Sequence, residues 1–347
     1  MPTNFAARVP GKNQPLVIEE APYPTAGENR LVVRVHALAV NAVDYAIQMM
    51  GEALFPWVTF PLVLGEDVAG EVVAVGPGVT RFQPGDRVVG QAVGSNANDS
   101  VEGAFQQYAV LRENMASTLP AAVAYAQASV IPLAFSTAIA GLFQKDYLGL
   151  QAPSLTPTPT GKTLLIWGGA TSVGCNAIQL AVAAGYEVIA TASPHNFDYV
   201  KRLGAAAVFD YKQPTIRDDL RAAFRGKTCA GALAIAGVVP QTRNEAAEAC
   251  LQVVADAEGD KFVALSMPAP PNVPDGVGCK FIFASTIKDN EVSHLLYGEY
   301  LPAALANGSF VPAPEPEVVG TGLEAIQGAL DALKQGVSAK KLVVTLP

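Results

Sequence analysis

The sequence is poor in charged residues, and basic residues are the scarcer kind. Only 16% of the 347 residues are charged, and 31 Asp and Glu outnumber 23 Lys and Arg, for a formal net charge of −8 at pH 7. No cluster of Lys and Arg is available to neutralise successive phosphates along a nucleic acid backbone. The excess of acidic over basic residues therefore argues against a nucleic acid partner.

Cysteine is scarce as well, and no two cysteines form a C-x-x-C pair. We expect buried, reduced thiols, as is usual for cytosolic proteins. The residues concerned are Cys175, Cys229, Cys250 and Cys279.

Long apolar runs are missing too. No run reaches the ~20 residues needed to span a bilayer, and Met1 to Val9 lacks the apolar core of a signal peptide. We therefore expect a cytoplasmic protein without a membrane partner. Half of the residues are nevertheless hydrophobic, so the chain can bury a large core and is expected to form two domains.

One stretch has the pattern of a dinucleotide-binding unit. The apolar run Leu164–Trp167 is followed by a turn of small residues, a helical segment from Cys175 to Ala184 and a second apolar run, Tyr186–Ala190. Such a strand–turn–helix places free N–H groups of the helix N-terminus at a pyrophosphate. In the turn we expect Gly169 to allow the tight bend and Gly174 the close approach of helix to strand.

Thr171 stands where the second glycine of G-x-G-x-x-G would be. Thr171 and Ser172 are therefore predicted to offer hydroxyl and N–H groups to phosphate.

The residues after the second strand indicate which cofactor is bound. An enzyme selective for NADH usually has Asp or Glu there to bind the ribose hydroxyls, but this chain has Ser193. Ser193, His195 and Asn196 can donate hydrogen bonds to a 2′-phosphate, and Tyr211 is expected at the same pocket. We therefore predict NADPH rather than NADH.

The rest of the chain divides into two patterns. Alternating apolar runs separated by turn residues, such as Leu31–Ala37, Gly70–Gly76 and Asp86–Gly90, predict a β-rich first domain. A short helix is expected at Asn41–Met50 and a longer one at Ala122–Phe143 with a break at Pro132. Gln151–Thr160, rich in Pro and Thr, is expected to be an exposed loop.

From Lys162 onward strands and helices alternate, which predicts a doubly wound parallel sheet. The expected strands are Ala207–Tyr211, Gly231–Ala236 and Lys261–Ser266, and the expected helices are Phe197–Leu203, Thr215–Phe224 and Asn244–Val254. Toward the C-terminus we expect helices near Leu295–Ala306 and Gly322–Lys334, and a last strand, Lys341–Leu346, that returns to the first domain.

Several motifs together resemble the medium-chain dehydrogenase/reductase superfamily. They are Asn41–Asp44, Leu64–Gly76, Pro84–Val88 and Gly103–Tyr108, in the order in which the family carries them, followed by the Gly169–Gly174 turn. The resemblance implies a GroES-like β-rich substrate domain (1–130, completed by 289–347) and a Rossmann NADPH-binding domain (131–288). It also implies an active site in the cleft between them.

The chain departs from the zinc-binding members of this superfamily. Asn41–Asp44 contains no thiol, Glu66 replaces the histidine of the Gly-His-Glu motif, and Ile131–Leu133 contains no Cys. The segment that would hold a structural zinc, 94–101, has no cysteine either. Zinc sites use Cys and His ligands, so we predict no metal.

Without a Lewis acid, hydride addition to an activated C=C bond is easier than alcohol oxidation. The zinc-free branches of the family are mainly quinone reductases and enoyl or alkenal reductases. The closest resemblance is to the fungal trans-acting enoyl reductases that partner polyketide synthases. It rests on Ser193–Phe197, the Pro-rich loop and the ending Ser338–Val344.

The resemblance also implies the site residues. For cofactor binding these are Val43, Asp44, Tyr45, Ala46, Gly169, Ala170, Thr171, Ser172, Val173, Ser193, Pro194, His195, Asn196, Tyr211, Leu265, Ser266, Val337 and Ser338. Thr137 is expected near the substrate carbonyl. Tyr45 is a candidate proton donor, although a packing role is open for it, and solvent is an alternative donor. Asn41 either orients the cofactor or caps the helix.

Three functions remain open at this point. The first is an NADPH-dependent enoyl or enone reductase acting on a small or carrier-bound unsaturated carbonyl, with a polyketide synthase as an implied partner. The second is a quinone reductase, with Trp57 stacking on the quinone, and the third is a non-catalytic NADPH-binding protein. A monomer and a homodimer are both compatible with the sequence.

Overall fold

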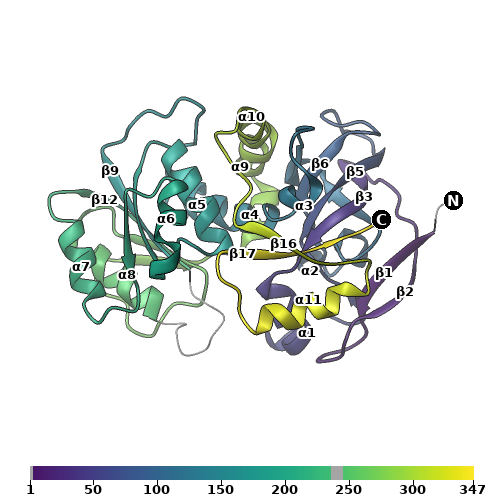
Figure 1. Cartoon of the computed structure of the whole chain (residues 1–347), viewed down its shortest axis with the longest axis horizontal. Coiled ribbons are helices and arrows are strands. Elements are labelled where there is room, and N and C mark those ends of the chain that lie inside the picture. The colour runs from purple at the N-terminus through teal and green to yellow at the C-terminus, as the bar shows by residue number, and fades with distance from the viewer. Residues whose placement is uncertain (1–2, 236–244) are drawn as a thin grey trace. The chain divides into compact units, whose positions relative to one another are not determined.

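The computed structural model describes residues 3–235 and 245–347, and these residues form two compact units (Figure 1). The first unit comprises Met1–Leu133 and Ser293–Pro347, and the second comprises Ala134–Val292. The domain boundaries predicted from the sequence were 130/131 and 288/289. The substrate and cofactor roles assigned to the two domains stay predictions.

The first unit is built around a seven-stranded sheet with the order β16-β17-β3-β5-β6-β8, in which β7 also pairs with β3. A three-stranded sheet, β2-β1-β4, lies beside it in the same unit. The strands are β1 (Asn4–Val9), β2 (Val17–Ala21), β3 (Arg30–Ala39), β4 (Leu62–Val63), β5 (Asp67–Val75), β6 (Arg87–Gln91), β7 (Tyr108–Arg112), β8 (Ala116–Thr118), β16 (Glu315–Thr321) and β17 (Lys340–Thr345).

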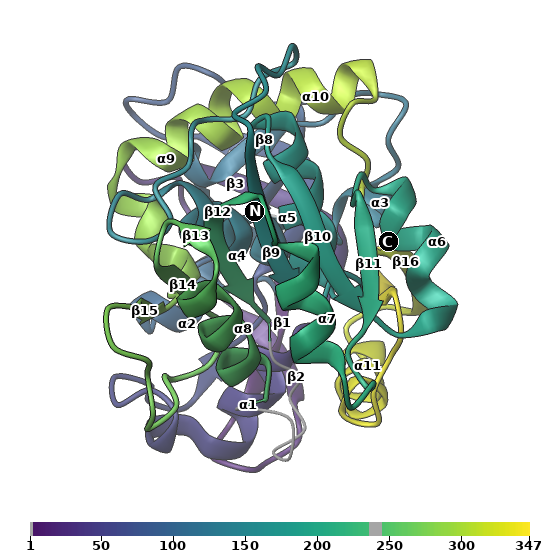
Figure 2. The ribbon, with the colours of Figure 1, turned by 90° about the vertical axis from the view of Figure 1, so that its left-hand side faces the viewer.

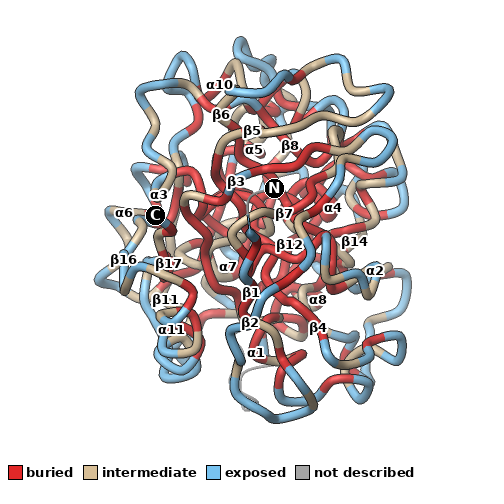
Figure 3. Tube along the Cα trace, turned by 90° about the vertical axis from the view of Figure 1, so that its right-hand side faces the viewer, coloured by how far each residue is buried: buried red, intermediate tan, exposed pale blue. Residues whose placement is uncertain are grey.

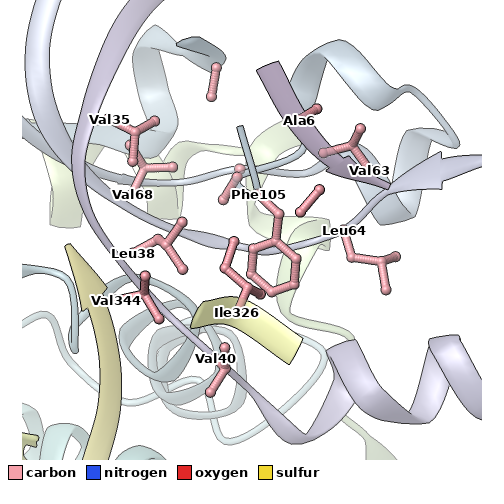
Figure 4. Close-up of a cluster of buried hydrophobic side chains, with 14 of the residues drawn as sticks. Ala6, Val35, Leu38, Val40, Val63, Leu64, Val68, Phe105, Ile326 and Val344 are labelled. Atoms are coloured by element: carbon pink, nitrogen blue, oxygen red, sulfur yellow. The ribbon is translucent and has the colours of Figure 1, made fainter. Parts of the chain in front are cut away.

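The C-terminal strand returns to the N-terminal part of the chain, as the sequence predicted. β17 pairs antiparallel with β3, and Val344 lies opposite Leu38. In Figure 4 these two side chains meet Val68 and Val35, and Ile326 approaches from a helix. All five are buried, so they join the last fifty residues to the first hundred in one hydrophobic core. In Figure 3 much of β3, β5 and β17 is coloured red, as buried.

The helices of the first unit are short. α11 (Ala325–Lys334) is amphipathic, with Ile326, Ala329 and Leu330 buried and its other face toward solvent. The others are α1 (Ala42–Met50), α2 (Gly94–Ala97), α3 (Tyr125–Ala128) and α10 (Leu301–Asn307), with a π-helical segment at His294–Tyr300. α9 (Glu291–Ser293) ends at the boundary with the second unit.

The second unit is a parallel sheet with the strand order β11-β10-β9-β12-β14-β15, and β13 pairs with β12. Its strands are β9 (Lys162–Trp167), β10 (Glu187–Ala192), β11 (Ala207–Asp210), β12 (Thr228–Ala234), β13 (Glu258–Gly259), β14 (Phe262–Leu265) and β15 (Gly278–Phe281). All pairs are parallel. The doubly wound arrangement predicted from the alternation of strands and helices is confirmed.

Helices cover the faces of this sheet (Figure 2). They are α5 (Ser172–Ala183), α6 (Phe197–Arg202), α7 (Ile216–Ala223) and α8 (Glu245–Asp256). Leu220 of α7 and Cys250 of α8 join Leu165 and Val263 of the sheet in one buried cluster. Two predicted end residues, Ala236 and Asn244, lie outside the described residues.

The long apolar segment before the second unit is divided in two. Instead of one helix over Ala122–Phe143, the structure has α3 and then α4 (Pro132–Phe143). α4 begins at the proline, because the first position of a helix needs no N–H donor. The predicted loop Gln151–Thr160 contains no helix or strand and is largely exposed, as expected.

One stretch, Tyr125–Phe143, is long and apolar enough to cross a membrane by length and composition. Protein surrounds most of it, because 78% of the apolar window is buried inside the structure. It is therefore weak support for a membrane span. Three of the four cysteines are buried as free thiols, whereas Cys279 is half-buried.

Candidate active site

The turn after β9 contains a glycine in the left-handed backbone region, but this glycine is not the predicted one. Gly168 has a φ of 87°, whereas Gly169 is not among the residues with positive φ. A side chain at Gly168 would be strained in this left-handed region. The tight bend predicted at Gly169 is therefore at Gly168, one residue earlier.

Gly174 has the role that its place in the motif suggested. A Cβ atom at Gly174 would lie 2.2 Å from the backbone oxygen of Gly168 and 2.8 Å from the Cα of Gly169. No side chain fits there without moving the backbone. The close approach of α5 to the end of β9 thus depends on this glycine.

Thr171 uses its hydroxyl within the turn. It is the N-cap residue of α5, where its Oγ1 accepts a hydrogen bond from the N–H of Gly174 (3.0 Å) and donates one to the Gly168 oxygen (2.7 Å). The single hydroxyl proton of Thr171 is used in the bond to Gly168. The predicted hydroxyl contact from Thr171 to phosphate is therefore not supported. The N–H groups of Ser172 and Val173 lie in the first helical turn, where no intrahelical acceptor exists. These groups remain candidates for holding the pyrophosphate.

The residues predicted to bind the adenosine phosphate lie just after the carboxyl ends of β10 and β11. The Ser193 hydroxyl donates to the Tyr211 hydroxyl at 3.2 Å, and the ring of Tyr211 lies 6.4 Å from that of Trp167. Asn196, three residues after Ser193, is half-buried, whereas Pro194 and His195 are exposed.

The sequence interpretation missed one cation here. The Lys212 ammonium lies 5.8 Å from the centroid of the Tyr211 ring. In the sequence, only its position directly after Tyr211 could have pointed to Lys212. Lys212 adds a positive charge beside the residues predicted to hold a 2′-phosphate.

Leu265 and Ser266 also lie at this edge of the sheet. The register aligns Trp167 with Ala234, and Ala234 with Leu265. Leu265 is buried, and the N–H of Ser266 donates to the Ala234 oxygen at 3.0 Å. Because the strands are parallel, the end of β14 and the phosphate turn share one edge, where ligands bind in such folds.

Other predicted residues belong to different elements. Thr137 is half-buried on α4 in the second unit. Val337 and Ser338 are exposed between α11 and β17 in the first unit. Their contacts with cofactor or substrate stay predictions.

The first turn of α1 carries the residues predicted to border the nicotinamide. Val43 and Ala46 are half-buried, whereas Tyr45 is packed into the hydrophobic core with only 9% of its surface exposed. The Asp44 carboxylate is buried and accepts backbone N–H groups from Asn41 (2.7 Å) and Gly65 (3.2 Å). Both oxygens of the Asp44 carboxylate thus have partners inside the unit. The partly exposed residues of this turn are Ala42, Val43 and Ala46.

Asn41 is the N-cap residue of α1, but its side chain does not cap the helix. The amide instead donates to the buried Asp67 carboxylate at 2.8 Å. Asn41 therefore stands at the cap position, but its side chain belongs to a buried polar network. Its predicted role in orienting the cofactor stays a prediction.

Glu66 lies in the same region, at the position of the family's zinc-binding histidine. One carboxylate oxygen accepts from Ser95 (2.6 Å) and the other from Gln91 (2.7 Å). Burial raises the pKa of Glu66, and these two hydrogen bonds partly offset the rise. Burial also raises the pKa of Asp44 well above its usual range, and the charge of Glu66 adds to that rise.

These residues do not fit a zinc ion. Glu66 is surrounded by an alcohol and an amide rather than by thiolate or imidazole, which are the usual zinc ligands. Within residues 3–235 and 245–347, no three His, Cys, Asp or Glu side chains are grouped so that they could hold a metal ion.

Two aromatic side chains form a stack in the first unit. The rings of Phe55 and Trp57 lie 4.9 Å apart and 17° from parallel. Trp57 is 42% exposed, and its indole N–H donates to the Ser95 oxygen at 3.2 Å. An exposed stacked indole can receive a further flat ring.

Comparison with known proteins identifies the family. The profile of the alcohol dehydrogenase GroES-like domain matches residues 27–121, and that of the zinc-binding dehydrogenases matches residues 172–272. Dehydrogenase azaJ of Aspergillus niger is 85% identical over 347 residues, covering 100% of both chains. This chain belongs to the medium-chain dehydrogenase/reductase superfamily. It is therefore an oxidoreductase, as predicted.

Other similar proteins agree with this assignment. Trans-enoyl reductase himH of Aspergillus japonicus is 35% identical over 322 residues, covering 91% of this chain and 89% of its own. An alcohol dehydrogenase superfamily protein from Novosphingobium aromaticivorans has the same fold, with a TM-score of 0.80, 27% identity and coverage of 99% of this chain and 100% of its own. The predicted GroES-like and Rossmann fold is thereby confirmed for this medium-chain reductase.

Proposed function

We propose that this medium-chain reductase uses NADPH to reduce a conjugated C=C bond in an enoyl or enone substrate. The observation that carries this proposal is that Glu66, at the position of the family's zinc-binding histidine, accepts hydrogen bonds from the Ser95 hydroxyl and the Gln91 amide. Hydride addition to an activated double bond is the family chemistry that needs no Lewis acid. The similarity to a protein named trans-enoyl reductase supports it.

The second unit supplies the cofactor site. The N–H groups at the start of α5 hold the pyrophosphate, and Ser193, Tyr211 and Lys212 hold the 2′-phosphate. A serine in place of Asp or Glu at the end of β10 removes the charge that would repel this phosphate. These contacts favour NADPH over NADH.

The reaction balances as one hydride and one proton. NADPH, when bound, supplies the hydride to the β-carbon, and the electrons of the C=C bond move to the carbonyl oxygen to form an enolate. A hydrogen-bond donor near the carbonyl stabilises that charge, and Thr137 is the candidate donor. The α-carbon then takes a proton from Tyr45 or from solvent.

The substrate is proposed to be a polyketide-type thioester or a free enone. The resemblance to trans-acting enoyl reductases extends this to a carrier-bound thioester presented by a polyketide synthase. The relative that is 85% identical is named only a dehydrogenase, so the substrate class rests on the relative that is 35% identical.

The decisive experiment uses purified protein, NADPH deuterated at the transferred position and a short enoyl thioester. We expect NADPH oxidation and deuterium at the β-carbon of the product. NADPH oxidation with quinones and none with enoyl thioesters or enones would contradict the proposal. Tight NADPH binding without turnover across both substrate classes would indicate a non-catalytic protein.

A quinone reductase is the second candidate. The exposed stack of Phe55 and Trp57 favours it, because a quinone ring can lie on the indole face. The comparison of Trp57→Ala on quinone and enoyl thioester turnover tests this alternative. A loss confined to quinone turnover would support the quinone reductase.

A further inference from the structure

The first unit contains a buried ion pair that no step above uses. The Lys341 ammonium on β17 lies 3.0 Å from an oxygen of Asp67 on β5, and their side chains are only 5% and 0% exposed. Removing two charges from water is costly unless their geometry is good and their remaining hydrogen bonds are made.

Those hydrogen bonds are made. The oxygen of Asp67 that faces Lys341 also accepts from the Asn41 amide, and the other accepts the N–H of Leu133 at 2.7 Å. Lys341 donates in addition to the Asn41 side-chain oxygen. Asn41 thus bridges the cation and the anion with its two ends.

The strand register explains how residues so far apart in sequence meet. Val343 of β17 and Asp67 of β5 both lie opposite Ala39 of β3. Because β17 and β3 are antiparallel, the residue two before Val343 faces the residue two after Ala39, and these are Lys341 and Asn41. Residues two apart on a strand share a face. All three polar side chains therefore lie on one face of the sheet.

The bridge continues into the helix that follows β3. The N–H of Asn41 donates to Asp44 in the first turn of α1, and the other oxygen of Asp44 accepts the N–H of Gly65 just before β5. A chain of hydrogen bonds thus leads from Lys341 through Asn41 to the first turn of α1. An apolar side chain at 341 would fill space but would leave the Asn41 oxygen without this donor.

We propose that Lys341, held by Asp67 and Asn41, is a positioning residue for the first turn of α1, residues 42–46. In this role it fixes Val43 and Ala46, which the family resemblance predicts to border the nicotinamide. That assignment rests on the proposed function. Lys341 itself touches neither cofactor nor substrate. It sets the orientation of the helix start through Asn41.

The test compares Lys341→Met with Lys340→Met, its matched control. Lys340 is the adjacent strand residue, is exposed, and pairs at the surface with Glu317 at 2.8 Å. For Lys341→Met we expect faster amide hydrogen exchange in residues 42–46. NADPH affinity and kcat/KM should each fall about tenfold or more, because small misplacements near a reacting centre are costly. Lys340→Met should stay within about twofold of wild type, because exposed ion pairs contribute little.

A merely structural ion pair would give a different result. The melting temperature of Lys341→Met would fall, but exchange in residues 42–46 and NADPH affinity would be unchanged below the transition, and the proposal would be wrong. If Lys341→Met does not fold, Asn41→Ala serves instead, because it keeps the ion pair and removes only the bridge. Wild-type exchange and affinity in Asn41→Ala would likewise overturn the proposal.

The same measurements separate this proposal from the proposed function. If the wild type binds NADPH but reduces no enoyl thioester, the proposed function fails and the NADPH affinities of the variants still decide the role of Lys341. If the wild type binds no NADPH, exchange in residues 42–46 decides whether Lys341 positions the turn.

Discussion

At the scale of single residues, the proposed preference for NADPH depends on the residues at the end of β10. Ser193 carries no charge, and its hydroxyl lies 3.2 Å from that of Tyr211, with Lys212 beyond the ring. Two hydroxyls and a cation suit a dianionic 2′-phosphate. A carboxylate at the same place would accept hydrogen bonds from free ribose hydroxyls instead.

Ser193→Asp is therefore expected to reverse the cofactor preference. The kcat/KM for NADPH should fall about tenfold or more, equivalent to ~1.4 kcal/mol, while turnover with NADH holds or rises. Lys212→Ala should weaken NADPH in the same direction and leave NADH kinetics unchanged. Steady-state kinetics with both cofactors measure the ratio, and an unchanged NADPH preference in Ser193→Asp would contradict the assigned pocket.

Glu66 illustrates a residue whose ionisation works against the fold. Burial raises its pKa in the folded protein above the value in the unfolded chain. The folded state therefore holds the proton more tightly, and the stabilisation is complete below the unfolded pKa. It is lost as pH rises through the folded pKa, because the ionised carboxylate is left in a poorly solvated site.

Glu66→Gln is expected to flatten this pH dependence. The amide oxygen can accept from Gln91 while the amide nitrogen donates to Ser95, so both hydrogen bonds survive without a charge. Melting temperatures measured from about pH 4.5 upward should fall less steeply with pH than those of wild type, with Glu28→Gln, an exposed glutamate, as the control. A slope equal to that of wild type would show that Glu66 is not a source of the pH dependence.

At the scale of elements, the phosphate turn and α5 form one unit of local structure. Thr171 closes the turn by bonding backward to Gly168 and forward to Gly174. Gly168 supplies the left-handed backbone conformation, and Gly174 allows the close approach. The first-turn N–H groups can face a phosphate only when this arrangement is intact.

Thr171→Val keeps the shape of the side chain and removes both hydrogen bonds. We expect the free energy of unfolding to fall by about 1 kcal/mol, the usual cost of losing an N-cap, together with weaker NADPH binding. Urea unfolding and NADPH titration measure the two effects. Thr171→Ser, which retains the hydroxyl, should behave like wild type, and a Thr171→Val protein of unchanged stability would show that the cap is unimportant.

At the scale of the whole molecule, the chain combines a β-rich unit with a doubly wound unit and lacks the ligands that zinc-binding relatives use. In the first unit, buried Lys341 pairs with Asp67, and its charge favours the ionised forms of the buried Asp44 and Glu66 carboxyl groups. The polar network there is satisfied by amides, hydroxyls and backbone N–H groups. Metal ligation would require thiolate or imidazole groups that these positions do not have.

The purified protein is therefore expected to contain no stoichiometric zinc, and incubation with EDTA should leave its reductase activity unchanged. Metal analysis by mass spectrometry and activity assays before and after chelation provide the check. One zinc per chain, with activity lost on chelation and restored by zinc, would refute the zinc-independent mechanism.

The sequence by itself was sufficient for features that depend on local pattern. The apolar run before Gly168, the small residues to Gly174 and the alternation after Lys162 specify the strand–turn–helix unit and its parallel sheet, because hydrophobic period and turn chemistry act over short distances. The break at Pro132 and the return of the last strand were recognised in the same way. The residue that carries the bend was placed one position too late, because two adjacent glycines are indistinguishable without backbone angles.

Only the tertiary structure decided what depends on register. Lys341 stands three hundred residues after Asn41, and nothing local in the sequence links either of them to Asp67. They meet because β17, β3 and β5 pair with one particular alignment, which places the three side chains on the same face. The hydrogen bond from the Gly65 N–H to the Asp44 carboxylate likewise joins residues that are distant in sequence. A side chain that looks available in the sequence is engaged once the fold supplies its partner.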